Sequence, residues 1–422
     1  MPGFGELAAG AMLASLTIFL VVRVRYPRMP IWSFMSFLAF LSVALGLVPV
    51  DSIGEAVNYD VVLFLIGMFS LVSIAEHAGL LDYLSYRFLG AFRSRLGMMT
   101  AASLLFGLLA AVSVNDTVAM AGVPIALSTA YSAGVDPEAM VLLLMFSLTV
   151  GSVFTPIGNP QNVLIAVESG MEAPFLTFVK YLAIPTLINL LLLPPIIMAF
   201  YRGAAEPGGS RERPQLRDRR DAVIAAAGLS TAVAALVVND LLELRGLPHV
   251  QNVGFIPFVV AAGTYLFVRD PREALRGVEW GTVIFFISMF ITMYGVWRSG
   301  LFYWLARLMM PSATSGMVGI LQISAVSLGL SQLLSNVPFV NLFIRGIGYG
   351  PGSAWAWLTL AYSSTIAGNL TLLGAASNII VLESLESRHG RTISFARFAE
   401  VGALVTLVNV AVYSAFLYLM LG

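Results

Sequence analysis

Long apolar runs separated by short polar loops constrain this chain more than any other feature. A helix needs about 20 mainly apolar residues to cross a bilayer, and runs approaching or exceeding that length lie at 7–22, 31–50, 61–75 and 177–201. Only 11% of the 422 residues are charged, against about 25% in a soluble domain. A transmembrane β-barrel would instead show alternating strands of about 10 residues. The sequence therefore predicts an all-α polytopic membrane protein.

The side-chain inventory argues against several functions. The 23 basic and 23 acidic residues give a net charge of zero, so nothing points to a nucleic-acid partner. The chain has no cysteine, which removes disulfides, thiol catalysis and thiolate metal sites. An intramembrane enzyme would need a nucleophile–base pair or a metal motif such as His-Glu-x-x-His, and we find neither. We expect no enzymatic activity and no cofactor, and no nucleotide motif supports ATP-driven pumping by this chain alone.

Arginine-rich loops predict the topology, because basic residues near span ends favour the cytoplasm. The loops share one side of the membrane if two apolar stretches do not cross it, and they lie at 23–28, 87–95, 202–220, 269–276 and 388–397. About ten spans then remain, expected at 6–22, 31–50, 59–77, 138–157, 177–200, 222–243, 250–268, 280–298, 354–386 and 398–421. We expect a multi-pass protein of the cell inner (plasma) membrane, with membrane lipid around it.

The two special stretches, 97–130 and 314–348, are each interrupted near the centre by a polar motif. The motifs are Ser113-Val-Asn-Asp-Thr117 and Ser335-Asn-Val-Pro338. We expect each half of a stretch to be too short to span alone. The prediction is two re-entrant helical hairpins, with Asn115 and Asn336 at their tips. Such irregular backbone is tolerated in the membrane only where it lines protein or a water-filled cavity.

The two halves of the chain share a repeat. Residues 59–84 match 280–305 at a constant offset of 221, and the same offset places Asn115 on Asn336. On the predicted topology the two copies are inverted, which is an architecture of transporters with a site at the bilayer midplane. The expected divisions are an N-terminal repeat 1–200, a cytoplasmic linker 201–221 and a C-terminal repeat 222–422.

Two further polar motifs interrupt apolar sequence. They are Thr155-Pro-Ile-Gly-Asn-Pro-Gln-Asn162, and Gly368-Asn together with Ser377-Asn378. Thr-Pro-Ile-Gly-Asn at 155–159 matches Thr-Ile-Ala-Gly-Asn at 365–369, now at an offset of 210. A broken helix exposes free N–H groups, which attract anions, and free carbonyls, which with Asn, Thr and Ser oxygens can coordinate Na⁺. We predict that the two tips and two breaks meet as a polar pocket.

Asp116 is the one carboxylate deep within a predicted apolar region. A charge at that depth is costly and usually functional. Asp116 could bind a coupling cation or carry a proton. It could equally cap the half-helix that follows it. These alternatives stay open on the sequence alone.

The four motifs resemble those of the ion transporter superfamily. The most similar members are the arsenite permease/NhaD-type and citrate-transporter-like permeases, which are relatives of the divalent anion:sodium symporters. The residues that carry the resemblance are Val114-Asn-Asp-Thr117 with Pro124, Thr155 to Asn162, Ser335-Asn-Val-Pro-Phe339, and Ala367-Gly-Asn-Leu-Thr-Leu-Leu-Gly-Ala-Ala-Ser-Asn378.

The resemblance implies an elevator-type homodimer, with a scaffold domain and a mobile transport domain in each protomer. It also implies two half-sites for a small anionic substrate and a coupling ion, with any Na⁺ near the Asn115/Asn159 and Asn336/Asn369 pairs. The candidate binding residues are Asn115, Asp116, Thr117, Thr155, Gly158, Asn159, Asn162, Ser335, Asn336, Thr365, Gly368, Asn369, Ser377 and Asn378.

One departure from the family pattern leaves the coupling ion open. The symporter branch has Ser-Asn-Thr at both tips, whereas these tips read Val-Asn-Asp-Thr and Ser-Asn-Val-Pro. Our leading interpretation is a secondary active transporter for a small anion or oxyanion, coupled to Na⁺ or H⁺. The alternative is a Na⁺/H⁺ antiporter or an arsenite-type efflux permease. A channel is disfavoured because inverted pairing suits alternating access.

Overall fold

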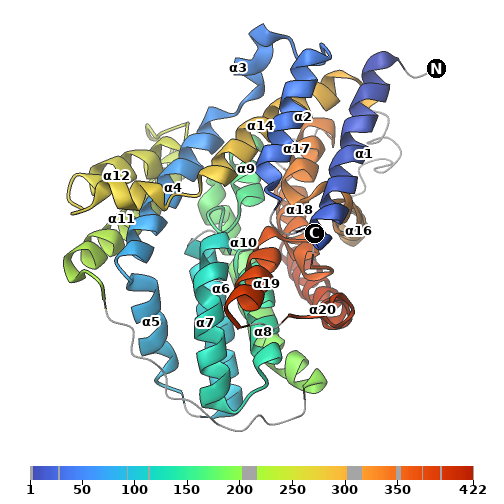
Figure 1. Cartoon of the computed structure of the whole chain (residues 1–422). Helices are drawn as coiled ribbons and strands as arrows, with labels where there is room; N and C mark the ends of the chain where they lie inside the picture. Colours follow the sequence, from blue (N-terminus) through green and yellow to red (C-terminus); the bar gives the residue numbers. More distant parts are fainter. Residues whose placement is uncertain are drawn as a thin grey trace.

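Every regular element that the structure describes is a helix (Figure 1). The computed structural model describes residues 3–26, 29–92, 94–112, 115–201, 216–301, 316–347, 353–372, 374–389 and 392–421. Within these ranges, the side chains of residues 24–25, 115–117, 120–121, 346–347 and 387–389 are not described.

Two groups of helices pack side by side, and each takes members from both halves of the chain. The first, here called the α4 group, contains α1 (Phe4–Arg25), α2 (Ile31–Ala44), α4 (Tyr59–His77), α11 (Arg219–Leu244), α12 (Phe255–Tyr265) and α14 (Trp280–Arg298). The second, here called the α8 group, contains α6 (Arg95–Val112), α7 (Asn115–Ala133), α8 (Pro137–Gly151), α9 (Pro160–Glu168), α10 (Pro174–Phe200), α16 (Gly316–Leu334), α17 (Asn336–Ile347), α18 (Ala354–Ile366), α19 (Ala376–His389) and α20 (Phe395–Leu421).

Short helices complete the described part: α3 (Ile53–Ala56), α5 (Leu80–Leu89) and α13 (Pro271–Arg276), with the 3₁₀ turns η1 (Val50–Ser52) and η2 (Ala367–Asn369). Among the described residues, eight helices are long and apolar enough to cross a membrane: α1, α4, α6, α10, α11, α14, α16 and α20.

This set corrects three expectations. The first halves of both predicted hairpins, α6 with 18 residues and α16 with 19, are long enough to span alone. The expected span 354–386 is two helices, α18 and α19, with a break between them. The expected spans 31–50 and 138–157 end early, at Ala44 and Gly151. In the last two cases apolar residues continue beyond the residue at which the backbone leaves the helix.

Helix α8 is the centre of the α8 group. All of its residues from Ala139 to Gly151 are buried, as expected for a helix that is apolar on every face. It begins at Pro137, where Asp136 accepts a hydrogen bond from the N–H of Glu138 at 2.8 Å. At its other end Gly151 lies against Gly107 of α6, because a Cβ added to Gly151 would lie 2.2 Å from the Gly107 Cα. This close crossing brings the end of α8 next to the end of α6.

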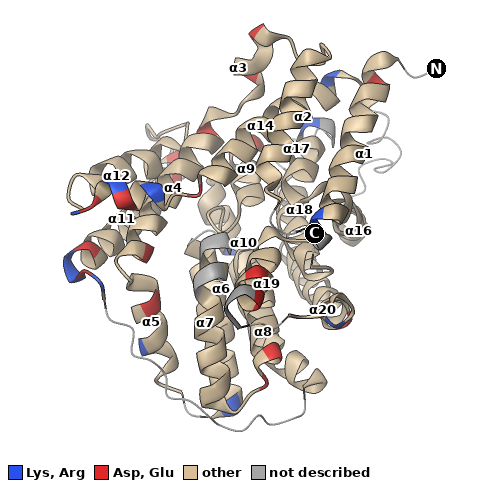
Figure 2. Ribbon diagram, viewed as in Figure 1, with Lys and Arg blue, Asp and Glu red and all other residues tan. Residues whose placement is uncertain are grey.

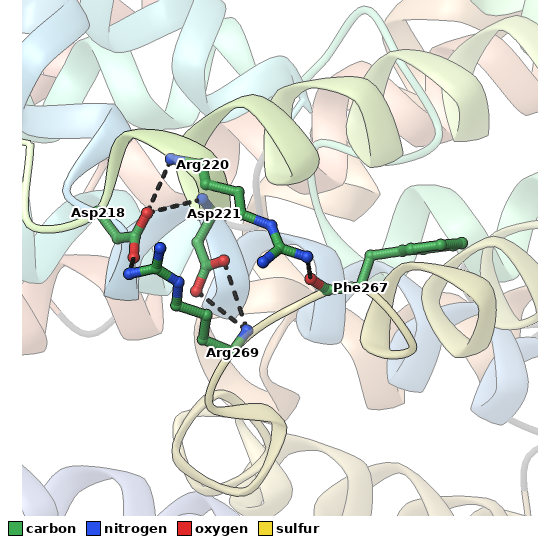
Figure 3. Close-up of polar contacts among 5 residues, drawn as sticks. All are labelled: Asp218, Arg220, Asp221, Phe267 and Arg269. Carbon is green, nitrogen blue, oxygen red and sulfur yellow. Dashed lines mark hydrogen bonds and ion pairs between the residues drawn. The ribbon is translucent and has the colours of Figure 1, made fainter.

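Charged residues lie mainly near helix ends and connections (Figure 2). At the start of α11, the Asp218 carboxylate accepts hydrogen bonds from the N–H groups of Arg220 and Asp221, at 2.7 and 3.2 Å (Figure 3). Its other oxygen pairs with Arg269 at 2.7 Å. The two N–H groups and the arginine lower the pKa of Asp218. This cluster joins the start of α11 to the segment after α12.

Candidate substrate-binding site

Two helices of the α8 group are interrupted. Helix α8 ends at Gly151 and α9 begins at Pro160, so residues 152–159 form the first break. Helix α18 ends at Ile366 and α19 begins at Ala376, so residues 367–375 form the second break, which opens with η2. Neither break contains a charged residue. The predicted interruptions therefore lie where the sequence motifs place them.

The two breaks share one hydrogen-bond pattern. In the first, the Asn162 Nδ2 donates to carbonyl oxygens at 3.1 and 3.2 Å. In the second, the Asn378 Nδ2 donates to carbonyl oxygens at 2.8 and 3.4 Å. The corresponding positions are 216 residues apart: Asn162 and Asn378 as donors, Ser152 and Gly368 as first acceptors, and Thr155 and Thr371 as second acceptors.

This pattern corrects the expected register of the second match. The offset is 216 rather than 210, and Thr371 takes the place that the sequence comparison gave to Thr365. The shared sequence is Thr-x-x-Gly-x-x-x-Asn, at 155–162 and 371–378. The spacing from Thr to Gly to Asn could have revealed it, but the five-residue similarity around Thr365 was more conspicuous.

The glycine of this shared sequence is required by a close approach. A Cβ on Gly158 would lie 2.3 Å from the carbonyl oxygen of Ser152. A Cβ on Gly374 would lie 2.7 Å from the carbonyl oxygen of Ala367. Real Cβ atoms do not approach backbone so closely, because the chain folds back on itself here. Both breaks are therefore tight loops held by one amide and one glycine.

A direct hydrogen bond joins the first break to the end of α18, just before the second break. The Asn159 Nδ2 donates to the Thr365 hydroxyl at 3.1 Å and to the Ser152 carbonyl at 3.1 Å. Its Oδ1 accepts from the N–H of Asn162 at 3.0 Å. The Thr155 hydroxyl donates to the carbonyl of Ala111 at the end of α6. The structure thus brings the first break, the end of α18 and the end of α6 together.

The second hairpin joins the same unit through a residue that the sequence analysis missed. Gln332, near the end of α16, donates through Nε2 to the carbonyl of Ala367 at 2.7 Å. Its Oε1 accepts from the Thr371 hydroxyl at 2.6 Å. A polar residue within an apolar helix was the available signal. Gln332 and Thr371 therefore extend the set of site residues.

The tip of this hairpin has an unusual backbone. Ser335 connects α16 to α17 with φ of +70°, a conformation that costs a non-glycine residue of order 1–3 kcal/mol and clusters at functional sites. Asn336 follows as the first residue of α17 and is 8% exposed. At the first hairpin the backbone of Asn115 begins α7. The predicted contacts of the Asn115, Asp116 and Thr117 side chains lie outside the described part.

Several buried oxygens have no hydrogen-bond partner among the described residues. They are the Oδ1 atoms of Asn162, Asn336, Asn369 and Asn378, and the Oγ of Ser377. A buried polar atom without a partner is costly, so these atoms need water, an ion or a substrate. Oxygen ligands of this kind suit hard cations. Asn159, in contrast, uses both ends of its amide for the protein, which makes Asn162 the better candidate in its half-site.

Other potential sites lie elsewhere or are lacking. No group of three or more His, Cys, Asp or Glu side chains that could hold a metal ion occurs among the described residues. One cavity of about 380 Å³ is lined by charged groups near the start of α14, among them Glu76, Arg217 and Glu279. Another, of about 330 Å³, lies beside Asp136 and Glu138. Neither cavity is lined by a predicted site residue.

Comparisons with known proteins place the chain among membrane transporters. The profile of the CitMHS family, described as a citrate transporter, matches residues 17–359. An uncharacterized transporter of Mycobacterium tuberculosis is 27% identical over 378 residues, covering 86% of each chain. The silicon efflux transporter LSI3 of Oryza sativa subsp. japonica is 26% identical over 440 residues, covering 89% of each chain.

Solved structures show the same fold at low identity. The YdaH transporter of Alcanivorax borkumensis superposes with a TM-score of 0.61 at 14% identity, over 96% of this chain and 98% of that one. MtrF of Neisseria gonorrhoeae, whose structure is described with a class of antimetabolite efflux pumps, gives a TM-score of 0.56 at 11% identity, over 96% and 94%. The matches span nearly the whole length of each chain.

Proposed function

Since the chain belongs to the CitMHS citrate transporter family, we propose that it is a secondary active transporter for a small anion or oxyanion, coupled to Na⁺ or H⁺. The family and the named relatives make it a multi-pass membrane transporter and not an enzyme. A plasma-membrane location is consistent with its bacterial relatives. The substrate class, the coupling ion, the mechanism and a homodimeric assembly are our proposal.

The observation that carries this proposal is the pair of breaks, the first of which is hydrogen-bonded to the end of α18 just before the second. Helices α9 and α19 begin at the breaks, and α8 and α18 end there. Helix starts present free N–H groups and a partial positive charge, which suits an anion. Helix ends present carbonyls, which together with the buried oxygens of Asn162 and Asn378 suit a cation. One unit can therefore hold a substrate anion and its coupling cation without a charged residue in either break.

Helix bounds support an inverted repeat. Helices α4 and α14 both have 19 residues, and α10 and α20 both have 27. Within each pair the start positions are 221 residues apart, and so are those of α7 and α17. Gly79 and Gly300, also 221 apart, have φ of +76° and +82°. We propose that the α8 group, with the two hairpins re-entrant, moves as the transport domain against the α4 group.

A second candidate is efflux of a neutral oxyacid such as silicic acid. One relative is named a silicon efflux transporter, and amides and hydroxyls without a neighbouring charge can bind a neutral hydroxide as well as an anion. Na⁺/H⁺ antiport is the remaining alternative. It would require no anion in the site.

Reconstitution into proteoliposomes separates these candidates. Labelled citrate, succinate, phosphate and silicic acid are offered under a Na⁺ gradient alone and a H⁺ gradient alone. A pH-sensitive dye inside the vesicles reports antiport when Na⁺ is added without substrate. Gradient-driven accumulation of an anion supports the proposal. Silicic acid movement supports the second candidate, and Na⁺-driven pH change without any anion supports the antiporter.

A further inference from the structure

Side chains of the α4 group hold residues 168–177, which run from the last residue of α9 through the first turn of α10. We call this segment the elbow. The Asn58 Nδ2, at the start of α4, donates to the Glu168 carboxylate at 3.0 Å. From the end of α11, Glu243 accepts from the N–H of Ala173 at 3.1 Å. Asp240 accepts from the N–H of Leu176 at 2.8 Å.

Helix α10 depends on these contacts because it lacks a cap of its own. Its N-cap residue is Ala173, whose side chain offers no hydrogen bond. The first N–H groups of a helix need partners from outside it, and a carboxylate there also interacts favourably with the helix dipole. Asp240, only 1% exposed, supplies that carboxylate from α11. A helix of the α8 group is therefore capped by a helix of the α4 group.

The elbow backbone is also strained. Ala173 has φ of +47°, a region that residues with a side chain rarely adopt. Such a conformation persists only where the surroundings determine it, and here the Glu243 carboxylate binds the N–H of that residue. Loss of the contact would let the elbow relax to another backbone conformation. The elbow thus has the features expected of a segment with two arrangements.

We propose that Asn58, Asp240 and Glu243 form a latch, which holds the elbow in the state seen here and releases it when the α8 group moves. The latch rests on the proposed function, since it needs the two groups to move against each other. All three contacts join the α4 group to one segment of the α8 group, so they break together in such a movement. The latch residues position the elbow and do not touch the proposed site.

Cross-linking tests the latch directly, because the native chain has no cysteine. The variant Asn58→Cys/Glu168→Cys is closed with a short bifunctional methanethiosulfonate reagent. The hairpin tip carries an azide-bearing unnatural residue at position 335 in place of a third cysteine, because the methanethiosulfonate would also modify a tip thiol. This azide is then labelled with a membrane-impermeant cyclooctyne in right-side-out and inside-out vesicles. The matched control pair is Asn239→Cys/Val250→Cys, which lies within the α4 group around a 3.2 Å contact.

We expect the tip to be labelled from both faces before cross-linking and from only one face afterwards. The labelling rate from the other face should fall at least tenfold, and dithiothreitol should restore it. The control pair should leave two-sided labelling intact. Two-sided labelling with the Asn58/Glu168 link closed would overturn the latch and leave alternating access standing. One-sided labelling in every vesicle, even without a link, would overturn both the latch and the alternating access of the proposed function.

Point variants give an independent readout with the same tip label. Asp240→Leu removes the acceptor for the Leu176 N–H, so the ratio of labelling rates from the two faces should change several-fold. Asp240→Asn keeps an acceptor oxygen and should change the ratio less. Glu243→Ala, at a part-exposed position, makes the same test without altering a buried residue. An unchanged ratio in Asp240→Leu and Glu243→Ala alike, as in the control Leu241→Ala at an exposed position, would overturn the latch.

Discussion

The amide of Asn162 should be a main contributor to the stability of the first break. Its Nδ2 donates to three carbonyl oxygens, those of Ser152, Val153 and Thr155, at 3.1, 3.1 and 3.2 Å. Each such bond contributes about 0.5–1.5 kcal/mol net. The amide has only two hydrogens, so the three carbonyls share two full bonds. Asn162→Ala should therefore lower the free energy of unfolding by about 1–3 kcal/mol.

The second break provides a matched comparison. Asn378 donates to two carbonyl oxygens, and one of these bonds is long, at 3.4 Å. Asn378→Ala should thus cost less, about 0.5–2 kcal/mol. Asn162→Asp should cost at least as much as Asn162→Ala at pH 8, since a carboxylate oxygen would face carbonyl oxygens where the amide now donates. The order of stability is the prediction: Asn378→Ala above Asn162→Ala, and Asn162→Ala at or above Asn162→Asp.

Thermal unfolding in detergent, followed by intrinsic fluorescence and by loss of the monodisperse peak on gel filtration, measures this order. Asn252→Ala, at an exposed amide in a loop, is the control and should keep the wild-type Tm. A Tm for Asn162→Ala equal to the control would show that the three carbonyls find other partners. A larger loss for Asn378→Ala than for Asn162→Ala would refute the bond-by-bond reasoning.

Three further predictions concern the hairpin tips and the start of α14. Asp116→Asn should abolish gradient-driven transport or uncouple it while leaving the Tm unchanged; normal coupled flux in proteoliposomes would remove Asp116 from the mechanism. Ser335→Gly should leave the free energy of unfolding within about 1 kcal/mol of wild type, since glycine tolerates φ of +70°. Ser335→Val should lower it more, because a β-branched side chain is strained at that φ. Equal Tm values for the two variants would show that the backbone at residue 335 is not strained. Burial raises the pKa of Glu279, so the ionised carboxylate destabilises the fold increasingly as pH rises above the ordinary pKa of 4.5. Glu279→Gln should therefore raise the Tm at pH 8 but not at a pH below 4.5. A gain in Tm that is the same at both pH values would contradict this reasoning.

Hydropathy predicted most helices well because burial in lipid or protein selects long apolar segments. The expected spans 59–77 and 280–298 coincide with α4 and α14. The repeat at an offset of 221 also marks the hairpin tips, where α7 begins at Asn115 and α17 at Asn336. Hydropathy could not show where α8 and α18 end, since the residues after Gly151 and Ile366 remain largely apolar. There the backbone leaves the helix because side-chain amides bind its carbonyls.

The sequence predicted which types of residue line the two breaks, but not which hydrogen bonds each side chain makes. The sequence indicated a polar pocket from two breaks, and the Asn159–Thr365 bond joins the first break to the end of α18 at 3.1 Å. The sequence could not show whether the nitrogen or the oxygen of each amide binds other protein groups, because that depends on contacts between segments far apart in the chain. Gln332 was missed for the same reason, since one polar residue in an apolar helix gives no indication of its partner. The roles of Asn115, Asp116 and Thr117 stay predictions.

The Asn159–Thr365 bond has a consequence for how the protein is made. Its two residues are 206 positions apart, so a ribosome adding about 5–20 residues per second needs about 10–40 s to supply the second partner after the first. During that interval the first break would enter the membrane before the Asn159 amide can bond to the Thr365 hydroxyl. An insertion factor that shelters the amino-terminal half until the carboxy-terminal half arrives would shorten this exposure. Expression of residues 1–200 alone should therefore yield a product that membrane proteases remove.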